Sequence, residues 1–163
     1  RTSNTALHMY DQLDLGEHED LRLLLLWACK LHEVGLSISH TNYPQHSGYI
    51  VEQSDMPGFS RELQNILGLM LRLQRSKVKV ALIEEMPRLN KHHRLIIALL
   101  RLAIILERSR DWDRSRHIKL KLKDKQLKLK FPKDYLEQHP LTFADLSQEM
   151  IEVEKLGYSL KFK

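Results

Sequence analysis

Apolar residues recur at helical spacing through the first two-thirds of the chain. The spacing predicts helices over 2–13, 21–34, 44–54, 60–74 and 90–109. The second is apolar almost throughout, so we expect it to be the central, buried helix. Ser60 and Asn90 are typical N-caps, and Pro44 suits the first turn of a helix. Gly35 is expected to end the second helix, and 75–87 to be an irregular connection.

Near Arg114 the hydrophobic period shortens to about 2 residues, which predicts strands after the helices. Two runs of alternating apolar and lysine residues, 118–122 and 127–131, flank a short polar break and predict a β-hairpin. An amphipathic helix over 141–156 is expected to cover its apolar face. Alternation over 158–162 predicts a final short strand.

This succession of elements predicts a mainly α fold in two parts. A helical domain is expected at 1–113 and a small α+β (β-β-α-β) domain at 114–163. Because a domain of that size buries little surface by itself, we expect it to pack on the helical domain. Hydrophobic residues make up 42% and charged residues 29% of the chain, which is typical of a folded globular protein.

Cysteine content and apolar run length bear on the cellular compartment. The one cysteine, Cys29, lies in an apolar helix, which indicates a core residue, excludes a disulfide framework and favours a reducing, cytoplasmic location. The longest apolar run, 23–29, is too short to cross a bilayer, so no membrane partner is expected. The chain begins at Arg1 rather than methionine, and we interpret it as a piece of a longer protein.

Charge is distributed unevenly along the chain. Residues 1–60 carry 3 basic and 8 acidic side chains, residues 61–113 carry 11 and 6, and residues 114–163 carry 12 and 7, within a net charge of +5. The basic later two-thirds suggest a polyanionic partner such as nucleic acid, polyphosphate or a phosphate-rich nucleotide. A solvated lysine-rich surface explains the same distribution, and charge alone does not separate the two interpretations.

The pair His32 and Glu33 closes the apolar second helix. This outline resembles the HD type of metal-dependent phosphohydrolase, whose metals need imidazole and carboxylate ligands that converge from separate helices. The HD signature also has an early His and a late Asp. Here the late Asp position holds Ile104, which cannot bind a metal, and the early His position falls near Arg1.

These changes predict a degenerate HD motif at His32, Glu33 and Ile104 that holds no metal. Glu33 in place of Asp also lengthens one ligand arm by a methylene. A mononuclear site built from His32, His40 and His46 stays open, although their spacing is not that of a standard zinc signature. The same histidines also fit ordinary roles, the first within helix packing and the other two near the surface.

Four blocks carry a wider resemblance, and the first and third are distinctive in combination. They are 31–38 (LHEVGLSI), 45–51 (QHSGYIV), 54–59 (SDMPGF) and 99–105 (LLRLAII). With His40, they resemble the C-terminal half of the exopolyphosphatase / guanosine pentaphosphate phosphohydrolase (Ppx/GppA) family. The resemblance extends over essentially the whole chain, although residues 112–163 match in pattern more than in letters.

The resemblance implies a four-domain enzyme that hydrolyses a terminal phosphoanhydride of inorganic polyphosphate or pppGpp. Its own N-terminal actin-like domains would carry catalysis and the magnesium site, and an HD-like helical domain and the small α+β domain would follow. This sequence shows no Gly-rich phosphate loop. No catalytic residue and no cofactor are therefore assigned to it, and the isolated chain is predicted to be inactive. The resemblance also implies a homodimer.

In the family, the C-terminal domains extend a basic channel that guides the substrate. The predicted carriers are Arg72, Arg75, Lys77 and Lys79, at a helix end and the connection after it, with His46 facing the same cleft. Arg suits phosphate oxygens by its bidentate fork and Lys as a point charge. A solvated helix terminus explains the same cluster, because cations also favour the negative end of a helix.

Two other functions stay open. An autonomous metal phosphohydrolase would use His32 and Glu33. A nucleic-acid-binding module would use the lysines of the predicted hairpin, but these lack the interleaved aromatic residues that stack on bases, so nucleic acid is the less favoured partner. The same lysines suit the simple solubilisation of an exposed sheet face. They are Lys119, Lys121, Lys128 and Lys130.

Overall fold

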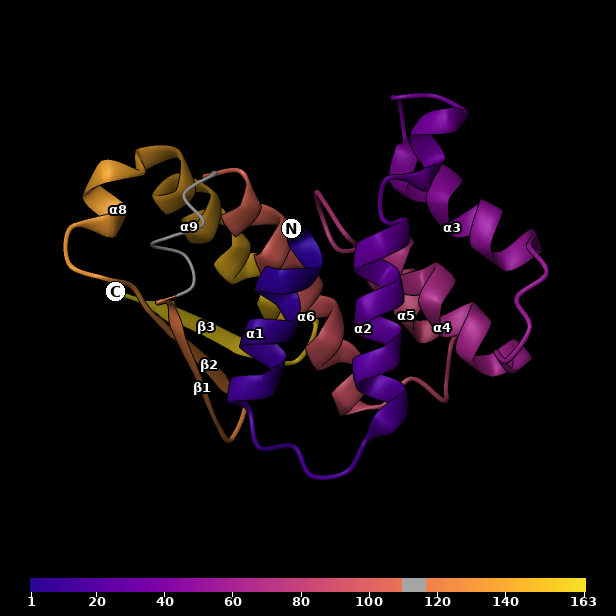
Figure 1. Cartoon of the computed structure of the whole chain (residues 1–163), viewed down its shortest axis with the longest axis horizontal. Helices are drawn as coiled ribbons and strands as arrows, with labels where there is room; N and C mark the ends of the chain where they lie inside the picture. The colour runs from indigo at the N-terminus through magenta and orange to yellow at the C-terminus, as the bar shows by residue number, and fades with distance from the viewer. Residues whose placement is uncertain (110–116) are drawn as a thin grey trace.

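The chain folds as a set of helices followed by a small three-stranded sheet, in a computed structural model that describes residues 1–109 and 117–163 (Figure 1). The helical part comprises α1 (Thr2–Gln12), α2 (Glu19–Leu31), the 3-10 helix η1 (Val34–Ser37), α3 (Tyr43–Gln53), α4 (Arg61–Arg72), α5 (Val80–Glu84) and α6 (Lys91–Glu107). After it come β1 (Lys119–Lys123), β2 (Gln126–Lys130), α8 (Tyr135–Gln138), α9 (Pro140–Lys155) and β3 (Ser159–Phe162). The predicted mainly α class with a small α+β part is confirmed. The predicted boundary between residues 113 and 114 lies outside the described residues.

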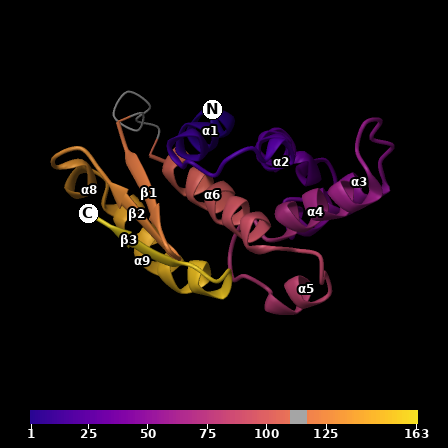
Figure 2. The ribbon, with the colours of Figure 1, turned by 90° about the horizontal axis from the view of Figure 1, so that it is seen from below.

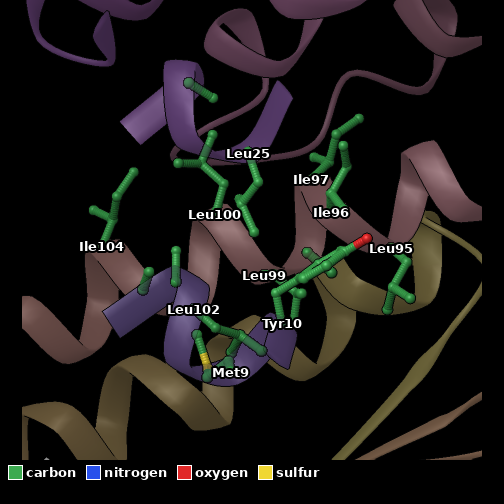
Figure 3. Close-up of a cluster of buried hydrophobic side chains, with 14 of the residues drawn as sticks. Met9, Tyr10, Leu25, Leu95, Ile96, Ile97, Leu99, Leu100, Leu102 and Ile104 are labelled. Atoms are coloured by element: carbon green, nitrogen blue, oxygen red, sulfur yellow. The ribbon is translucent and has the colours of Figure 1, made fainter. Parts of the chain in front are cut away.

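Helix α6 is the centre of the molecule and lies between α1 and α2 on one side and α9 on the other (Figure 2). Residues 95–106 are all buried, and Figure 3 shows Leu25 of α2 directed toward Leu100. The expectation that the second helix would be central was wrong. Leu23 on α2 is 39% exposed, because this helix covers one side of α6 and turns its other face to solvent.

Side-chain caps begin two of the helices, as the sequence predicted. Ser60 Oγ accepts a hydrogen bond from the Leu63 N–H at 3.1 Å at the start of α4. At the start of α6, Asn90 Oδ1 accepts from the His93 N–H at 3.0 Å, and His93 Nδ1 accepts from the Asn90 N–H at 3.1 Å. This reciprocal capping box satisfies backbone donors that the first helical turn leaves unpaired. The expected irregular connection 75–87 contains the short helix α5.

Gly35 has a different role from the one expected. Helix α2 ends at Leu31, and Gly35 lies within η1, so it does not terminate the helix. A Cβ at this position would lie 2.5 Å from Ser47 N, so only glycine allows α3 to approach this closely. The Gly35 N–H donates to Ser47 Oγ at 2.8 Å, and Ser47 Oγ donates to the His32 carbonyl at 3.2 Å. The close approach therefore sets α3 against the end of α2.

The sheet has the order β1-β2-β3, with the predicted hairpin antiparallel and β3 parallel to β2 after the α9 crossover. Leu120 opposes Leu129, and β3 continues this apolar face, which packs against α9. Gln12 of α1 closes the outer edge of β1. It accepts from the Leu120 N–H at 3.0 Å and donates to the Ile118 carbonyl at 3.3 Å.

A buried ion pair joins the sheet-bearing part to the helices. Arg101 of α6 donates to both carboxylate oxygens of Glu149 on α9, at 2.7 and 2.9 Å. Its Nη1 and Nη2 also donate to the carbonyl oxygens of Leu73 and Ser76, each at 2.5 Å. Such a pair is stable only when its hydrogen-bonding groups are satisfied, as they are here. Around it, one hydrophobic cluster continues from α1, α2 and α6 into α9 and the sheet.

Cys29 is a core residue, as predicted, and burial raises the pKa of its thiol to about 12. It therefore stays protonated and unreactive at neutral pH. Among the helices that the structure describes, none has the length and apolar character needed to cross a membrane.

Candidate anion-binding site

The loop after α4 carries most of the predicted substrate-binding residues, and buried contacts hold it in place. Arg101 binds the carbonyl oxygens of Leu73 and Ser76 at its beginning. Further along, the Val78 N–H donates to Glu152 Oε1 on α9 at 2.7 Å. The backbone of Ser76 is left-handed, with φ of 61°, which turns the loop between these anchors. Hydrogen bonds to α6 and α9 therefore hold the backbone of the loop that carries these cations.

A hollow of about 310 Å³ lies between this loop and the start of α3. Four of the five predicted substrate-binding residues line it: Arg72, Arg75, Lys77 and Lys79. The fifth, His46, is half-buried on α3 and is not among the described residues that line this hollow. The fold thus gathers the cations of the α4 end and of the following loop around one space.

Arg72 is engaged inside the protein. It donates to the two carboxylate oxygens of Glu52 at 2.6 and 3.2 Å and to Gln45 Oε1 at 2.9 Å. Glycines make room for this pair between α3 and α4. A Cβ on Gly48 would lie 2.5 Å from Arg72 Cγ, and one on Gly68 would lie 2.6 Å from Glu52 Cγ. Because Glu52 offsets the charge of Arg72, the main role of this arginine is to link α3 to α4, and it attracts an anion less strongly.

Arg75 is held by a neutral partner instead. Its Nη1 donates to the Tyr43 hydroxyl at 2.8 Å, and its guanidinium lies 5.5 Å from the centroid of the same ring. Tyr43 is buried and Arg75 is half-buried. Because a phenol and an aromatic face carry no net negative charge, the full charge of Arg75 remains available to a ligand.

Lys77 and Lys79 complete the basic rim of the hollow. Both are exposed. The neighbouring cations Arg72 and Arg101 are paired with glutamates, whereas no described carboxylate lies within ion-pair distance of either lysine. Together with Arg75, they form a cluster of cations that has no ion-pair partner in the part of the chain that the structure describes, and we call Arg75, Lys77 and Lys79 the loop cations.

The positions of the degenerate HD motif do converge in space. A hollow of about 350 Å³ is lined by His32, Glu33 and Ile104, together with Arg1 at the early position. His32 Nε2 lies 3.3 Å from Glu33 Oε1, and its Nδ1 lies 2.6 Å from the Cys29 carbonyl. The Ile104 hydrocarbon and the Arg1 guanidinium stand where metal ligands would be needed. These residues do not fit a divalent metal.

The three histidines of the possible mononuclear site are not gathered together. His32 lines the HD-motif hollow, and His40 lines the hollow of the loop cations with its ring 6.0 Å from that of Tyr43. Across the part of the chain that the structure describes, no group of three or more His, Cys, Asp or Glu is arranged to hold a metal ion.

A third and larger hollow, of about 560 Å³, lies between the loop, α6 and α9. Its walls include Ile104, Ile151 and Arg108, whose Nη1 donates to Asp145 Oδ2 at 3.2 Å. Arg75 lines this hollow and both of the others. It is therefore the residue at which the three spaces meet.

Sequence reasoning missed Tyr43 and Arg108 at this site. Tyr43 is 32 positions from its partner Arg75, and Arg108 is 37 positions from Asp145. Neither spacing carries a local signal, because the pairs form only when distant helices pack together. Tyr43 directly precedes Pro44, which points only to the start of a helix.

Comparison with known proteins identifies the family. Residues 1–150 match the family model described as Ppx/GppA phosphatase, domain III. The guanosine-5'-triphosphate,3'-diphosphate pyrophosphatase of Pseudoalteromonas translucida (strain TAC 125) is 32% identical over 84% of this chain and 28% of its own length. The protein of the same name from Aeromonas salmonicida (strain A449) is 29% identical over 97% of this chain and 33% of its own length. The chain thus spans about a third of these relatives, and it belongs to the Ppx/GppA phosphatase family, in the part that forms domain III.

Proposed function

We propose that this chain is the substrate-guiding part of a phosphoanhydride hydrolase that acts on pppGpp or inorganic polyphosphate. The observation that carries the proposal is the set of loop cations, which line one hollow without a counter-charge among the described residues. Catalysis would reside in actin-like domains of the same protein, with magnesium held there. The names of the relatives support a guanosine-type substrate.

The role of the loop cations follows from their chemistry. Arg75 offers a planar fork that pairs with two phosphate oxygens, and Tyr43 already orients that fork. Lys77 and Lys79 add point charges along the rim of the hollow. An anionic phosphate chain would lie across these groups and be held for delivery to a reaction centre elsewhere. The proposal assigns no catalytic residue to this chain, so we expect the chain alone to bind but not hydrolyse.

The decisive experiment is a titration of this chain with long-chain polyphosphate and, separately, with pppGpp over a series of salt concentrations. The variant Arg75→Gln/Lys77→Gln/Lys79→Gln removes the loop cations. A matched variant, Lys30→Gln/Arg88→Gln/Lys91→Gln, removes the same charge from positions that do not line this hollow: on α2, in the turn before α6 and at the start of α6. Each phosphate contact contributes about 0.7 to the slope of log affinity against log salt, so the loop variant should lose about 2 from that slope.

Equal binding by the loop variant and by its matched control would refute the proposal. Hydrolysis by the chain alone that disappears in His32→Ala would favour the autonomous phosphohydrolase instead. A homodimer in the cytoplasm is also part of the proposal. Sedimentation analysis of the chain that shows only monomer at every concentration would remove this chain as the source of dimer contacts.

A further inference from the structure

The solvent-facing side of the sheet carries lysine along all three strands. These side chains are exposed and alternate with the leucines that pack inward, so they share one face. Residues Gln126 and Ser159 occupy the other positions of that face. We call the basic residues the lysine face. They are Lys119, Lys121, Lys123, Lys128, Lys130, Lys161 and Lys163.

The strand register sets these lysines directly against one another. Lys119 opposes Lys130, and Lys121 opposes Lys128, which in turn opposes Lys161. Side chains at opposed positions begin only about 4.5–5.5 Å apart at Cβ, and like charges there destabilise a sheet. Within the described ranges, no residue of the lysine face forms an ion pair, whereas Lys155 on α9 pairs with Glu152. No ion pair among the described residues therefore offsets this repulsion.

Protection of sheet edges explains only part of this arrangement, because β1 and β3 are edge strands and β2 is not. Lysine on an edge strand blocks unwanted pairing with another chain. Lys128 and Lys130, however, are on β2, the central strand. The outer edge of β1 is already closed by Gln12, which bonds to the backbone of that strand. At the β2 positions, edge protection gains nothing from the repulsion.

We infer that the lysine face is a second binding surface, distinct from the loop cations, for a flexible linear phosphate polymer. Ammonium groups recognise charge alone, and the face offers no aromatic ring for base stacking and no apolar side chain for insertion into a bilayer. A rigid duplex would touch a flat sheet along one line, whereas a flexible chain can cross all three strands. The choice of a phosphate polymer as the ligand rests on the proposed function, whereas the lysine face itself is defined by the structure alone.

The test compares the face variant Lys121→Gln/Lys128→Gln/Lys161→Gln with the loop variant and with Lys30→Gln/Arg88→Gln/Lys91→Gln, all in the full chain. The probes are long-chain inorganic polyphosphate, duplex DNA and vesicles of anionic phospholipid. For polyphosphate, the face variant should lose about 2 from the salt slope and bind about 100-fold more weakly near 0.1 M salt. Its melting temperature should not fall, because opposed like charges have been removed.

Each result bears on one surface. A face variant that binds polyphosphate as well as the matched control overturns the inference, whatever the loop variant does. A loop variant that binds normally beside a weakened face variant refutes the proposed function and leaves the lysine face standing. DNA or vesicle binding that is as tight as polyphosphate binding and is lost in the face variant overturns the choice of ligand.

Discussion

Tyr43→Phe tests whether the tyrosine hydroxyl positions Arg75 for a phosphate ligand. The substitution removes one oxygen and leaves the ring in place. It therefore deletes the 2.8 Å hydrogen bond to Arg75 and keeps the ring that lies 5.5 Å from the guanidinium. Tyr43→Ala would be a poor substitute, because loss of a buried aromatic ring costs about 3–5 kcal/mol of stability.

The expected effect on binding follows from side-chain order. Without its hydrogen bond, the Arg75 side chain must be ordered by the ligand, at about 0.5–1.5 kcal/mol. That loss corresponds to about 2- to 10-fold weaker binding of pppGpp or polyphosphate. The number of charges is unchanged, so the salt slope should stay at the wild-type value. This combination of weaker affinity and unchanged slope separates positioning from loss of charge.

Calorimetric titration of the wild type, Tyr43→Phe, Arg75→Gln and the double variant completes a cycle. In the Arg75→Gln background, Tyr43→Phe should have no further effect, because the group that it positions is gone. The hydroxyl contributes about 1 kcal/mol to folding, so thermal unfolding must confirm that every variant is folded. Wild-type affinity in Tyr43→Phe, together with weakened Arg75→Gln, would show that Arg75 needs no positioning.

Three further predictions concern the scaffold. Arg101→Met leaves Glu149 buried without its arginine partner and should lower the free energy of unfolding, measured by urea titration, by about 3–5 kcal/mol. Adding Glu149→Leu should recover part of that loss. If it recovers none, the loss does not come from the unpaired carboxylate. Ile104→Asp should not acquire metal in elemental analysis, because a guanidinium still occupies the early position, and stoichiometric manganese would contradict this. Burial is the main cause that lowers the pKa of both His92 and His93 below 6.5 in the folded protein. As pH falls, the unfolded chain therefore binds protons before the folded one does. The free energy of unfolding should be constant above about pH 6.5 and should decrease as pH drops through the pKa values of the folded protein. Urea unfolding between pH 8 and pH 5 (about one-unit steps) should show a smaller loss in His93→Gln, and an equal loss would assign the effect elsewhere.

The parts of the fold that depend on local rules could be predicted from sequence. Ser60 and Asn90 cap helices because their side chains bond to backbone within three residues. The alternation of leucine and lysine predicted the hairpin, because residues two apart share one face of a strand. Which helix is most buried was harder to predict from the sequence. Helix α6 contains Arg101 yet is the most buried helix described, since the neutralising Glu149 comes 48 positions later.

In the candidate site, too, some features could be predicted from sequence and others depend on the packing of distant segments. Family spacing singled out His32 and Ile104 as positions of a degenerate motif, and both line one hollow. Spacing could not show that Arg72 is neutralised by Glu52 while Arg75 is held by a phenol. Both arginines have the same charge and lie three positions apart, and only the packing of α3 against α4 gives them different partners. Charge counts along a sequence therefore overstate the positive charge available to a ligand.

The hydrocarbon of Ile104 and the guanidinium groups that line the same hollow are consistent with one another physically. A divalent metal cluster beside His32 would place several positive charges in the hollow that Arg1, Arg75 and Arg108 also line. The metal ions and the guanidinium groups would then repel one another, and carboxylate ligands would be needed to offset this repulsion. With Ile104 at the ligand position, the carboxylates that line this hollow pair with other groups: Glu107 lies 2.7 Å from Arg1, and Glu33 lies 3.3 Å from His32. Among the described residues, Arg1 pairs with Glu107 and Arg108 with Asp145, which leaves Arg75 as the arginine of this hollow without a carboxylate partner.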